Sequence, residues 1–143
     1  MGKILIVYAT RTDETKGLAD LIAEGIRIAG HEPILKKTSE IKSEDDLKGY
    51  DGYAFGSATY HGEMIISMKQ ILFIAERAEL EGKPGGAFGA YGWSGEAPGR
   101  IFETMAHIYK MDMVSGPLML KASSVGGGLQ AAQEYGKSIT DKI

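Results

Sequence analysis

Five short apolar runs, separated by segments with helical spacing, constrain the fold of this chain more than any other feature. The runs cover residues 3–8, 32–37, 52–57, 85–91 and 113–120. Between them apolar residues recur every three or four positions, as in Leu18, Ile22 and Ile26, which is typical of amphipathic helices. Strands that alternate with helices form parallel sheets with helices on both faces. The pattern therefore predicts an α/β fold.

The order of these elements limits the topology. Helices are expected over residues 18–26, 65–75, 101–108 and 129–143, with a short helical turn at 43–47. Right-handed crossovers leave few arrangements, and a three-layer sandwich with a five-stranded parallel sheet in the order 2-1-3-4-5 fits best. Ligands of such sheets bind beyond the carboxyl ends of the strands, where the strand order reverses. We therefore expect the site in the segments that follow the first, third and fourth strands.

Composition excludes several classes of protein. With 143 residues and 43% hydrophobic content, we expect one domain over residues 1–143. The net charge is −3 and no basic block occurs, so nucleic acid is not an expected partner. The chain has no cysteine, and its three histidines lack ligand spacing, so we expect no metal site. It shows neither a signal-peptide pattern nor an apolar run of membrane-spanning length, which predicts a cytoplasmic protein without membrane contact.

The segment after the first strand, TRTDET at residues 10–15, has the composition of an anion site. Thr10, Thr12 and Thr15 place hydroxyls at every second or third position, where a strand leads into a helix. The N-terminus of a helix adds free backbone N–H groups and a positive dipole end. Asp13 and Glu14 leave two alternatives open. One of them caps the helix and the segment binds nothing, or both point outward and the anion lies among hydroxyls and amides.

Two further segments supply aromatic and small residues. GSATYHG, residues 56–62, follows the third strand with small and hydroxyl residues and then an aromatic. GAYGWSGE, residues 89–96, follows the fourth strand and sets two aromatics among glycines, which allow a flat ring to approach the backbone closely. The three segments together predict an anion-binding site beside a slot lined by aromatic side chains.

These residues resemble the flavodoxins over the whole chain. The threonines of residues 10–15 match the Thr/Ser-x-Thr-x-x-Thr phosphate loop of that family, and Ser57, Thr59 and Tyr60 match its loop after the third strand. AFGAYGWSGEA, residues 87–97, is most similar to the flavodoxin domain of flavodiiron proteins. The resemblance implies that FMN is bound. It implies contacts from Thr10, Arg11, Thr12, Asp13, Glu14, Thr15, Ser57, Ala58, Thr59, Tyr60, His61, Gly62, Gly89, Ala90, Tyr91, Gly92, Trp93 and Gly95.

The resemblance also implies roles. The threonine hydroxyls and the amides of residues 11–15 would hold the phosphate, Tyr60 and Trp93 would flank the ring, and Glu63 near the ring would lower its potential. At residues 13–14 the chain departs from the Gly-Asn usual in the family, and like charges near a phosphate dianion cost roughly 1 kcal/mol. The implied function is a monomeric electron carrier without catalytic residues. It would shuttle electrons at low potential between redox protein partners, a reductase and an electron acceptor.

Two other functions fit a similar fold. An FMN-dependent NAD(P)H:quinone reductase usually needs additional loops for a substrate pocket, and the connections of this chain are short. Such an enzyme would oxidise NAD(P)H unaided, whereas a carrier needs a separate reductase. A receiver domain needs acidic residues where the first and third strands end, and this chain has Ala9-Thr10 and Gly56-Ser57 there. The carrier is the function that the sequence predicts.

Overall fold

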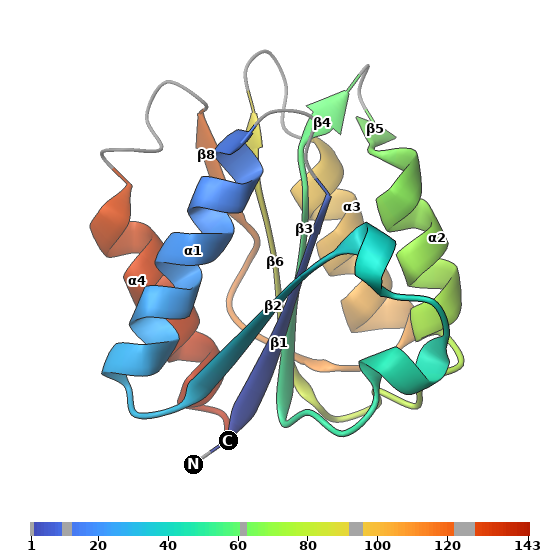
Figure 1. The fold of residues 1–143 in the computed structure, drawn as a ribbon, viewed down its shortest axis with the longest axis horizontal. Coiled ribbons are helices and arrows are strands. Elements are labelled where there is room, and N and C mark those ends of the chain that lie inside the picture. Colours follow the sequence, from blue (N-terminus) through green and yellow to red (C-terminus); the bar gives the residue numbers. More distant parts are fainter. Residues whose placement is uncertain (1, 10–12, 61–62, 92–95, 122–127) are drawn as a thin grey trace.

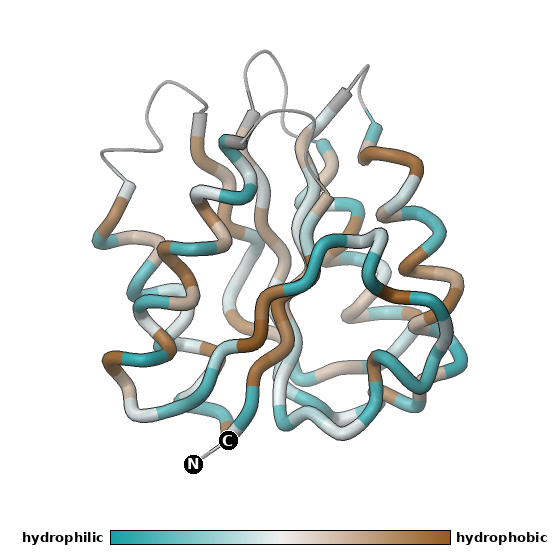
Figure 2. Tube along the Cα trace, viewed as in Figure 1, coloured by the Kyte–Doolittle hydropathy of each residue, from teal (hydrophilic) through white to brown (hydrophobic). Residues whose placement is uncertain are grey.

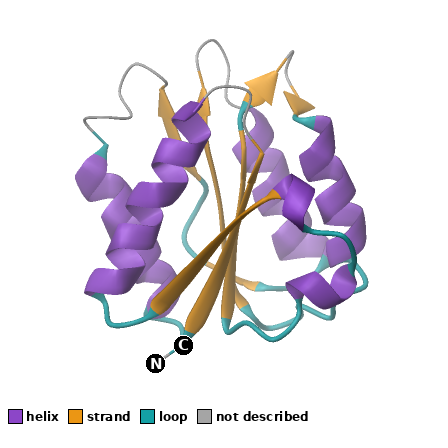
Figure 3. Cartoon of the chain, in the orientation of Figure 1, coloured by secondary structure: helices purple, strands orange, loops and turns teal. Residues whose placement is uncertain are grey.

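A parallel β-sheet lies between two pairs of helices in the computed structural model, which describes residues 2–9, 13–60, 63–91, 96–121 and 128–143 (Figures 1 and 3). The strands of the sheet are β1 (Lys3–Ala9), β2 (Glu32–Lys37), β3 (Gly52–Ser57), β6 (Pro84–Tyr91), β7 (Asp112–Met113) and β8 (Leu118–Lys121). Their order is β2-β1-β3-β6, and β7 and β8 both pair with β6. All these pairs are parallel, which confirms the predicted 2-1-3-4-5 arrangement.

The fifth strand is interrupted, whereas the sequence predicted one strand over residues 113–120. β7 pairs with the start of β6 and β8 pairs with its end. Residues 114–117 between them contain Gly116 and Pro117, which weaken a strand through flexibility and through a missing N–H group. At this level the side chain of Tyr135 takes the place of a strand: the Ala87 N–H donates to its hydroxyl at 3.0 Å, and the hydroxyl lies 2.7 Å from the Gly116 carbonyl oxygen.

The helices cover both faces of the sheet. α1 (Asp13–Ile28) and α4 (Leu129–Thr140) lie on one face. α2 (Ile66–Ala75) and α3 (Glu96–Glu103) lie on the other, and α3 continues as a π-helical turn η3 (Thr104–Ile108) (Figure 1). Two 3₁₀ turns, η1 (Thr38–Glu40) and η2 (Glu44–Leu47), connect β2 to β3. The four predicted helices are confirmed, although two of them, α1 and α3, begin five residues earlier than predicted.

Successive side chains of each strand point to opposite faces of the sheet, and this produces two hydrophobic cores. In β1, Ile4 and Ile6 pack against α1 and α4, whereas Leu5 and Val7 pack on the side of α2 and α3, and all four are fully buried. Hydrophobic segments, brown in Figure 2, run along the central strands and alternate with hydrophilic ones along the helices. α1 and α4 pack closely against each other. A Cβ atom on Gly136 of α4 would lie only 2.4 Å from the Ile22 carbonyl oxygen of α1. The core therefore fixes the sheet on which the site is built.

A two-stranded hairpin lies beyond the end of β3 and was not predicted. It consists of β4 (Thr59–Tyr60) and β5 (Glu63–Met64), which pair antiparallel with each other. Two-residue strands are too short to show a hydrophobic period. No helix in the described part of the chain has the length and apolar character needed to cross a membrane.

Candidate functional site

The three segments singled out in the sequence begin at one edge of the sheet. Ala9, the last residue of β1, is in register with Ser57, the last residue of β3, and the Ala58 N–H donates to the Ala9 carbonyl at 3.4 Å. On the other side, Gly56 is in register with Phe88, so β6 reaches the same level. The parallel direction of the strands thus brings the starts of all three segments together, as the strand order predicted.

The structure covers part of the predicted site. Thr10, Arg11, Thr12, His61, Gly62, Gly92, Trp93 and Gly95 lie outside the described residues, as do the side chains of Asp13, Tyr60 and Tyr91. Contacts of these groups with a ligand therefore stay predictions. The remaining predicted residues are Glu14, Thr15, Ser57, Ala58, Thr59, Gly89 and Ala90.

Thr15 carries the clearest sign of a ligand. It lies in the first turn of α1 and is only 1% exposed, and its hydroxyl has no hydrogen-bond partner among the described residues. A buried hydroxyl without a partner costs free energy, so an acceptor brought by a ligand would satisfy it. The adjacent Glu14 is exposed, so one of the two acids points to solvent. A hydroxyl and the amides of a helix N-terminus form a donor set that fits a phosphate group.

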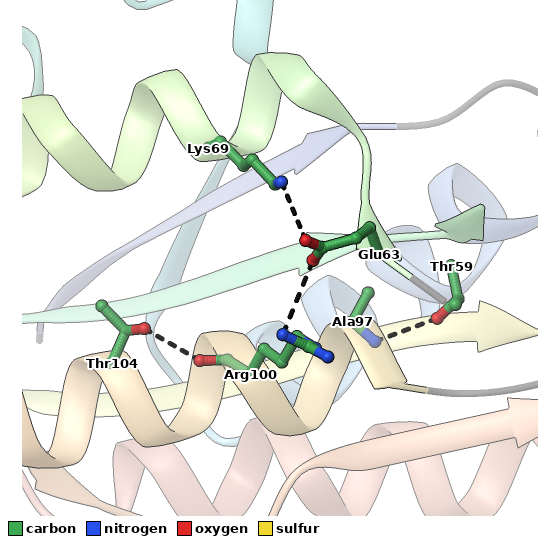
Figure 4. Close-up of polar contacts among 6 residues, drawn as sticks. All are labelled: Thr59, Glu63, Lys69, Ala97, Arg100 and Thr104. Carbon is green, nitrogen blue, oxygen red and sulfur yellow. Dashed lines mark hydrogen bonds and ion pairs between the residues drawn. The ribbon is translucent and has the colours of Figure 1, made fainter. Parts of the chain in front are cut away.

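The hydroxyls of Ser57 and Thr59 hold the edge segments together. Ser57 Oγ accepts a hydrogen bond from the Ile65 N–H at 2.9 Å and donates to the Ala58 carbonyl at 2.8 Å. Thr59 Oγ1 accepts from the Ala97 N–H at 3.0 Å, which links the segment after β3 to the start of α3 (Figure 4). A hydroxyl has one donor, and that of Ser57 is used within the protein. Direct contacts of these two residues with FMN stay predictions.

Gly89 is required by the packing of the protein itself. A Cβ atom at this position would lie 2.2 Å from the Ser57 carbonyl oxygen and 2.8 Å from Cγ of Pro98. The sequence-based interpretation was that glycines here allow a flat ring to approach. In the structure, the approach of β3 and α3 alone accounts for the missing side chain. Contact of Gly89 and of the buried Ala90 with a ring stays a prediction.

Glu63 forms an ionic contact with both helices of its face. Its carboxylate lies 3.0 Å from Lys69 Nζ of α2 and 3.8 Å from Arg100 Nη1 of α3 (Figure 4). The hydrogen bond from Lys69 lowers the pKa of Glu63 below its ordinary value of 4.5, and the charge of Arg100 acts in the same direction. The sequence suggested an acid near the ring but gave no sign of either cation. Arg100 lies 37 residues further along the chain, and no local pattern signals that contact.

The strand order reverses between β1 and β3, and at this edge the N-terminus of α1 carries a buried hydroxyl that has no partner among the described residues. This arrangement is typical of α/β proteins that bind phosphate-bearing cofactors. The family model described as Flavodoxin matches residues 6–136. The chain therefore belongs to the flavodoxin family of FMN-binding electron-transfer proteins, and FMN is its cofactor. Flavodoxin is itself an example of ligand binding where the strand order reverses.

Known relatives agree with this assignment. The chain is 41% identical to a flavodoxin of Aquifex aeolicus, over 66% of this chain and 54% of the relative. It is 31% identical to the type A flavoprotein fprA of Rhodobacter capsulatus, over 98% of this chain but 33% of the relative, so it spans between a third and about half of these proteins. A solved flavodoxin from the domain Archaea superposes with a TM-score of 0.91 and 30% identity, covering 98% of this chain and 97% of that one.

Proposed function

We propose that this chain is an electron carrier that receives electrons from a reductase and passes them singly, at low potential, to a protein acceptor. FMN, when bound, supplies the redox chemistry, and the residues of the chain bind it, orient it and keep water from one side. The observation that carries the proposal is the buried hydroxyl of Thr15, which lacks a partner among the described residues at the start of α1.

The described residues support separate tasks. The Thr15 hydroxyl and the first amides of α1 would hold the phosphate, without any need for a basic side chain. The hairpin formed by β4 and β5 would bring Tyr60 to the ring, and Thr59 keeps that hairpin in contact with α3. None of these tasks breaks or forms a covalent bond in a substrate. They are the tasks of a carrier, which needs a fixed cofactor and an accessible edge.

The first experiment is an FMN titration of the purified chain followed by reduction with and without a reductase. We expect quenched flavin fluorescence at micromolar FMN and no oxidation of NAD(P)H by the FMN-loaded chain alone. Addition of a flavodoxin reductase would then start NAD(P)H oxidation. Oxidation of NAD(P)H with a quinone as acceptor and no reductase would favour an FMN-dependent quinone reductase instead. Absence of FMN binding would rule out both functions.

The carrier is proposed to act as a monomer. Size-exclusion chromatography with light scattering on the FMN-loaded chain should give a mass close to the 15.4 kDa of one chain. A stable dimer would contradict this part of the proposal. It would also favour the reductase, since such enzymes usually complete their substrate pocket at a dimer interface.

A further inference from the structure

The hairpin formed by β4 and β5 lies outside the main sheet. In the part of the chain that the structure describes, its strands pair only with each other, Thr59 with Met64 and Tyr60 with Glu63. A strand within a sheet is held by backbone hydrogen bonds to its neighbours. In the described residues β4 and β5 have no such ladder to the sheet, and side-chain contacts help to hold them in place.

Besides the contacts of Glu63, two hydrogen bonds and one buried side chain among the described residues attach the hairpin to the fold. At its base, the Ile65 N–H donates to Ser57 Oγ. In its first strand, Thr59 Oγ1 accepts from the Ala97 N–H. The side chain of Met64 is buried in the core between the sheet and α2. Glu63 adds a further contact of the hairpin with each of the two helices.

The carboxylate of Glu63 bridges α2 and α3, and we call the contact of Glu63 with Lys69 and Arg100 the carboxylate bridge (Figure 4). Oε2 accepts a hydrogen bond from Lys69, and Oε1 lies nearest to Arg100. All three side chains are between 41% and 58% exposed, so each pair alone contributes weakly. Together, the two pairs join three elements at one carboxylate.

We propose that Glu63 is a positioning residue for FMN, whose carboxylate bridge holds the hairpin against α2 and α3 and thereby sets the reduction potential of the cofactor. This proposal rests on the proposed function, because it requires FMN at the carboxyl edge of the sheet. The bridge acts in two ways. It fixes the hairpin that carries Tyr60, and it compensates the charges of Lys69 and Arg100, which without Glu63 would favour the more negative reduced cofactor.

The reduction potential separates this role from a purely structural one. By linkage, the potential of bound FMN differs from that of free FMN according to the ratio of the protein's affinities for the oxidised and reduced forms. A residue that only supports the fold changes both affinities by the same factor and leaves the potential unchanged. A residue that positions the hairpin and balances its charge changes the two affinities unequally.

The test compares three variants. Glu63→Gln removes the charge of the bridge at constant size, and Arg100→Gln removes one of its cations. Glu44→Gln is the matched control, because Glu44 also pairs across elements, with Arg77 at 3.2 Å, and it lies in η2, away from the carboxyl edge. For each protein we would measure hydrogen exchange at residues 63–65 without FMN, the dissociation constant of FMN, and both one-electron midpoint potentials.

We expect Glu63→Gln to accelerate exchange in the hairpin about threefold or more, since weak exposed pairs are lost. Its second midpoint potential should rise by about 30 mV, which corresponds to a threefold change in the affinity ratio at 59 mV per tenfold. Arg100→Gln should also accelerate exchange, but it should lower the potential because it removes a positive charge. Glu44→Gln should match the original chain in hydrogen exchange of the hairpin and in both midpoint potentials.

The outcomes distinguish this proposal from the one on which it rests. If the original chain takes up no FMN, the proposed function fails and the role of Glu63 fails with it. If the original chain binds FMN and Glu63→Gln has the potentials of Glu44→Gln, only the role of Glu63 is overturned. A weaker affinity with unchanged potentials would also overturn it, because that result describes a structural residue.

Discussion

Replacing Thr15 by valine should affect stability and FMN affinity in opposite directions. Valine has nearly the shape of threonine and a similar helix propensity, so the first turn of α1 is retained. Without FMN, the change removes a buried hydroxyl that has no partner among the described residues. Leaving such a group unsatisfied costs about 1–3 kcal/mol, so we expect the FMN-free variant to be more stable by about 1 kcal/mol.

With FMN present, the loss of the Thr15 hydroxyl should be unfavourable. A hydrogen bond from a hydroxyl to a charged acceptor contributes about 1.5–3 kcal/mol, and Thr15→Val removes it from the phosphate. At 1.4 kcal/mol per tenfold, FMN should bind about 10- to 150-fold more weakly. The unfolding entropy of a chain of this length, about 0.3 kcal/mol per kelvin, converts the gain of 1 kcal/mol without FMN into a rise of about 3 °C in Tm.

Two controls isolate the phosphate contact. Thr15→Ser retains the hydroxyl and should bind FMN within a few-fold of the original chain. Riboflavin, which lacks the phosphate, should bind Thr15→Val and the original chain equally well. The affinities come from quenching of flavin fluorescence, and the stabilities from urea unfolding without FMN. If Thr15→Val binds FMN within about threefold of the original chain, a ratio worth less than 0.7 kcal/mol, the hydroxyl does not hold the phosphate.

Three further predictions concern the surroundings of the site. Tyr135→Phe should lower the free energy of unfolding by about 1–3 kcal/mol in urea, because the Ala87 N–H loses its acceptor at the interruption of the fifth strand. Gly136→Ala should destabilise by about 1–3 kcal/mol in the same assay, since its Cβ would overlap with the Ile22 carbonyl; an unchanged midpoint would disprove the close helix contact. The lowered pKa of Glu63 means that the carboxylate bridge is complete above pH 4.5 and is lost as the pH falls through the pKa in the folded chain. Corrected for intrinsic rates, hairpin protection should therefore fall below pH 4.5 in the original chain and stay flat in Glu63→Gln.

The strands could be predicted because their signal is local. β2 and β3 have the bounds that the apolar runs gave, 32–37 and 52–57. The fifth strand is different, since between β7 and β8 the hydroxyl of Tyr135, which lies in another element, contacts both β6 and Gly116. The hairpin formed by β4 and β5 is held by contacts to α2 and α3, and its two-residue strands carry no period of their own.

For the site too, local sequence features could be predicted, whereas contacts between elements distant in sequence could not. The threonines of residues 10–15, taken with the segments after the third and fourth strands and the resemblance to flavodoxins, predicted a phosphate loop, whereas the same residues alone left helix capping open. The burial of Thr15 and the exposure of Glu14 depend on how α1 packs on the sheet, which is a property of the folded chain and not of the local sequence. The bridge from Glu63 to Arg100 joins two elements that are distant in sequence, so it could not be found by reading along the chain.

The way the site is attached separates the control of stability from the control of potential. Backbone ladders and two buried cores fix the chain up to Ser57 and Ala9, and substitutions there change the free energy of unfolding of the whole fold. Beyond these residues, in the described part of the hairpin, the connections to the fold pass mainly through the side chains of Ser57, Thr59 and Glu63. Such contacts contribute little to global stability, but each one biases where the hairpin lies. Substitutions in the hairpin contacts should therefore shift the potential of FMN at nearly constant stability. Core substitutions should instead change the free energy of unfolding and leave the potential nearly unchanged.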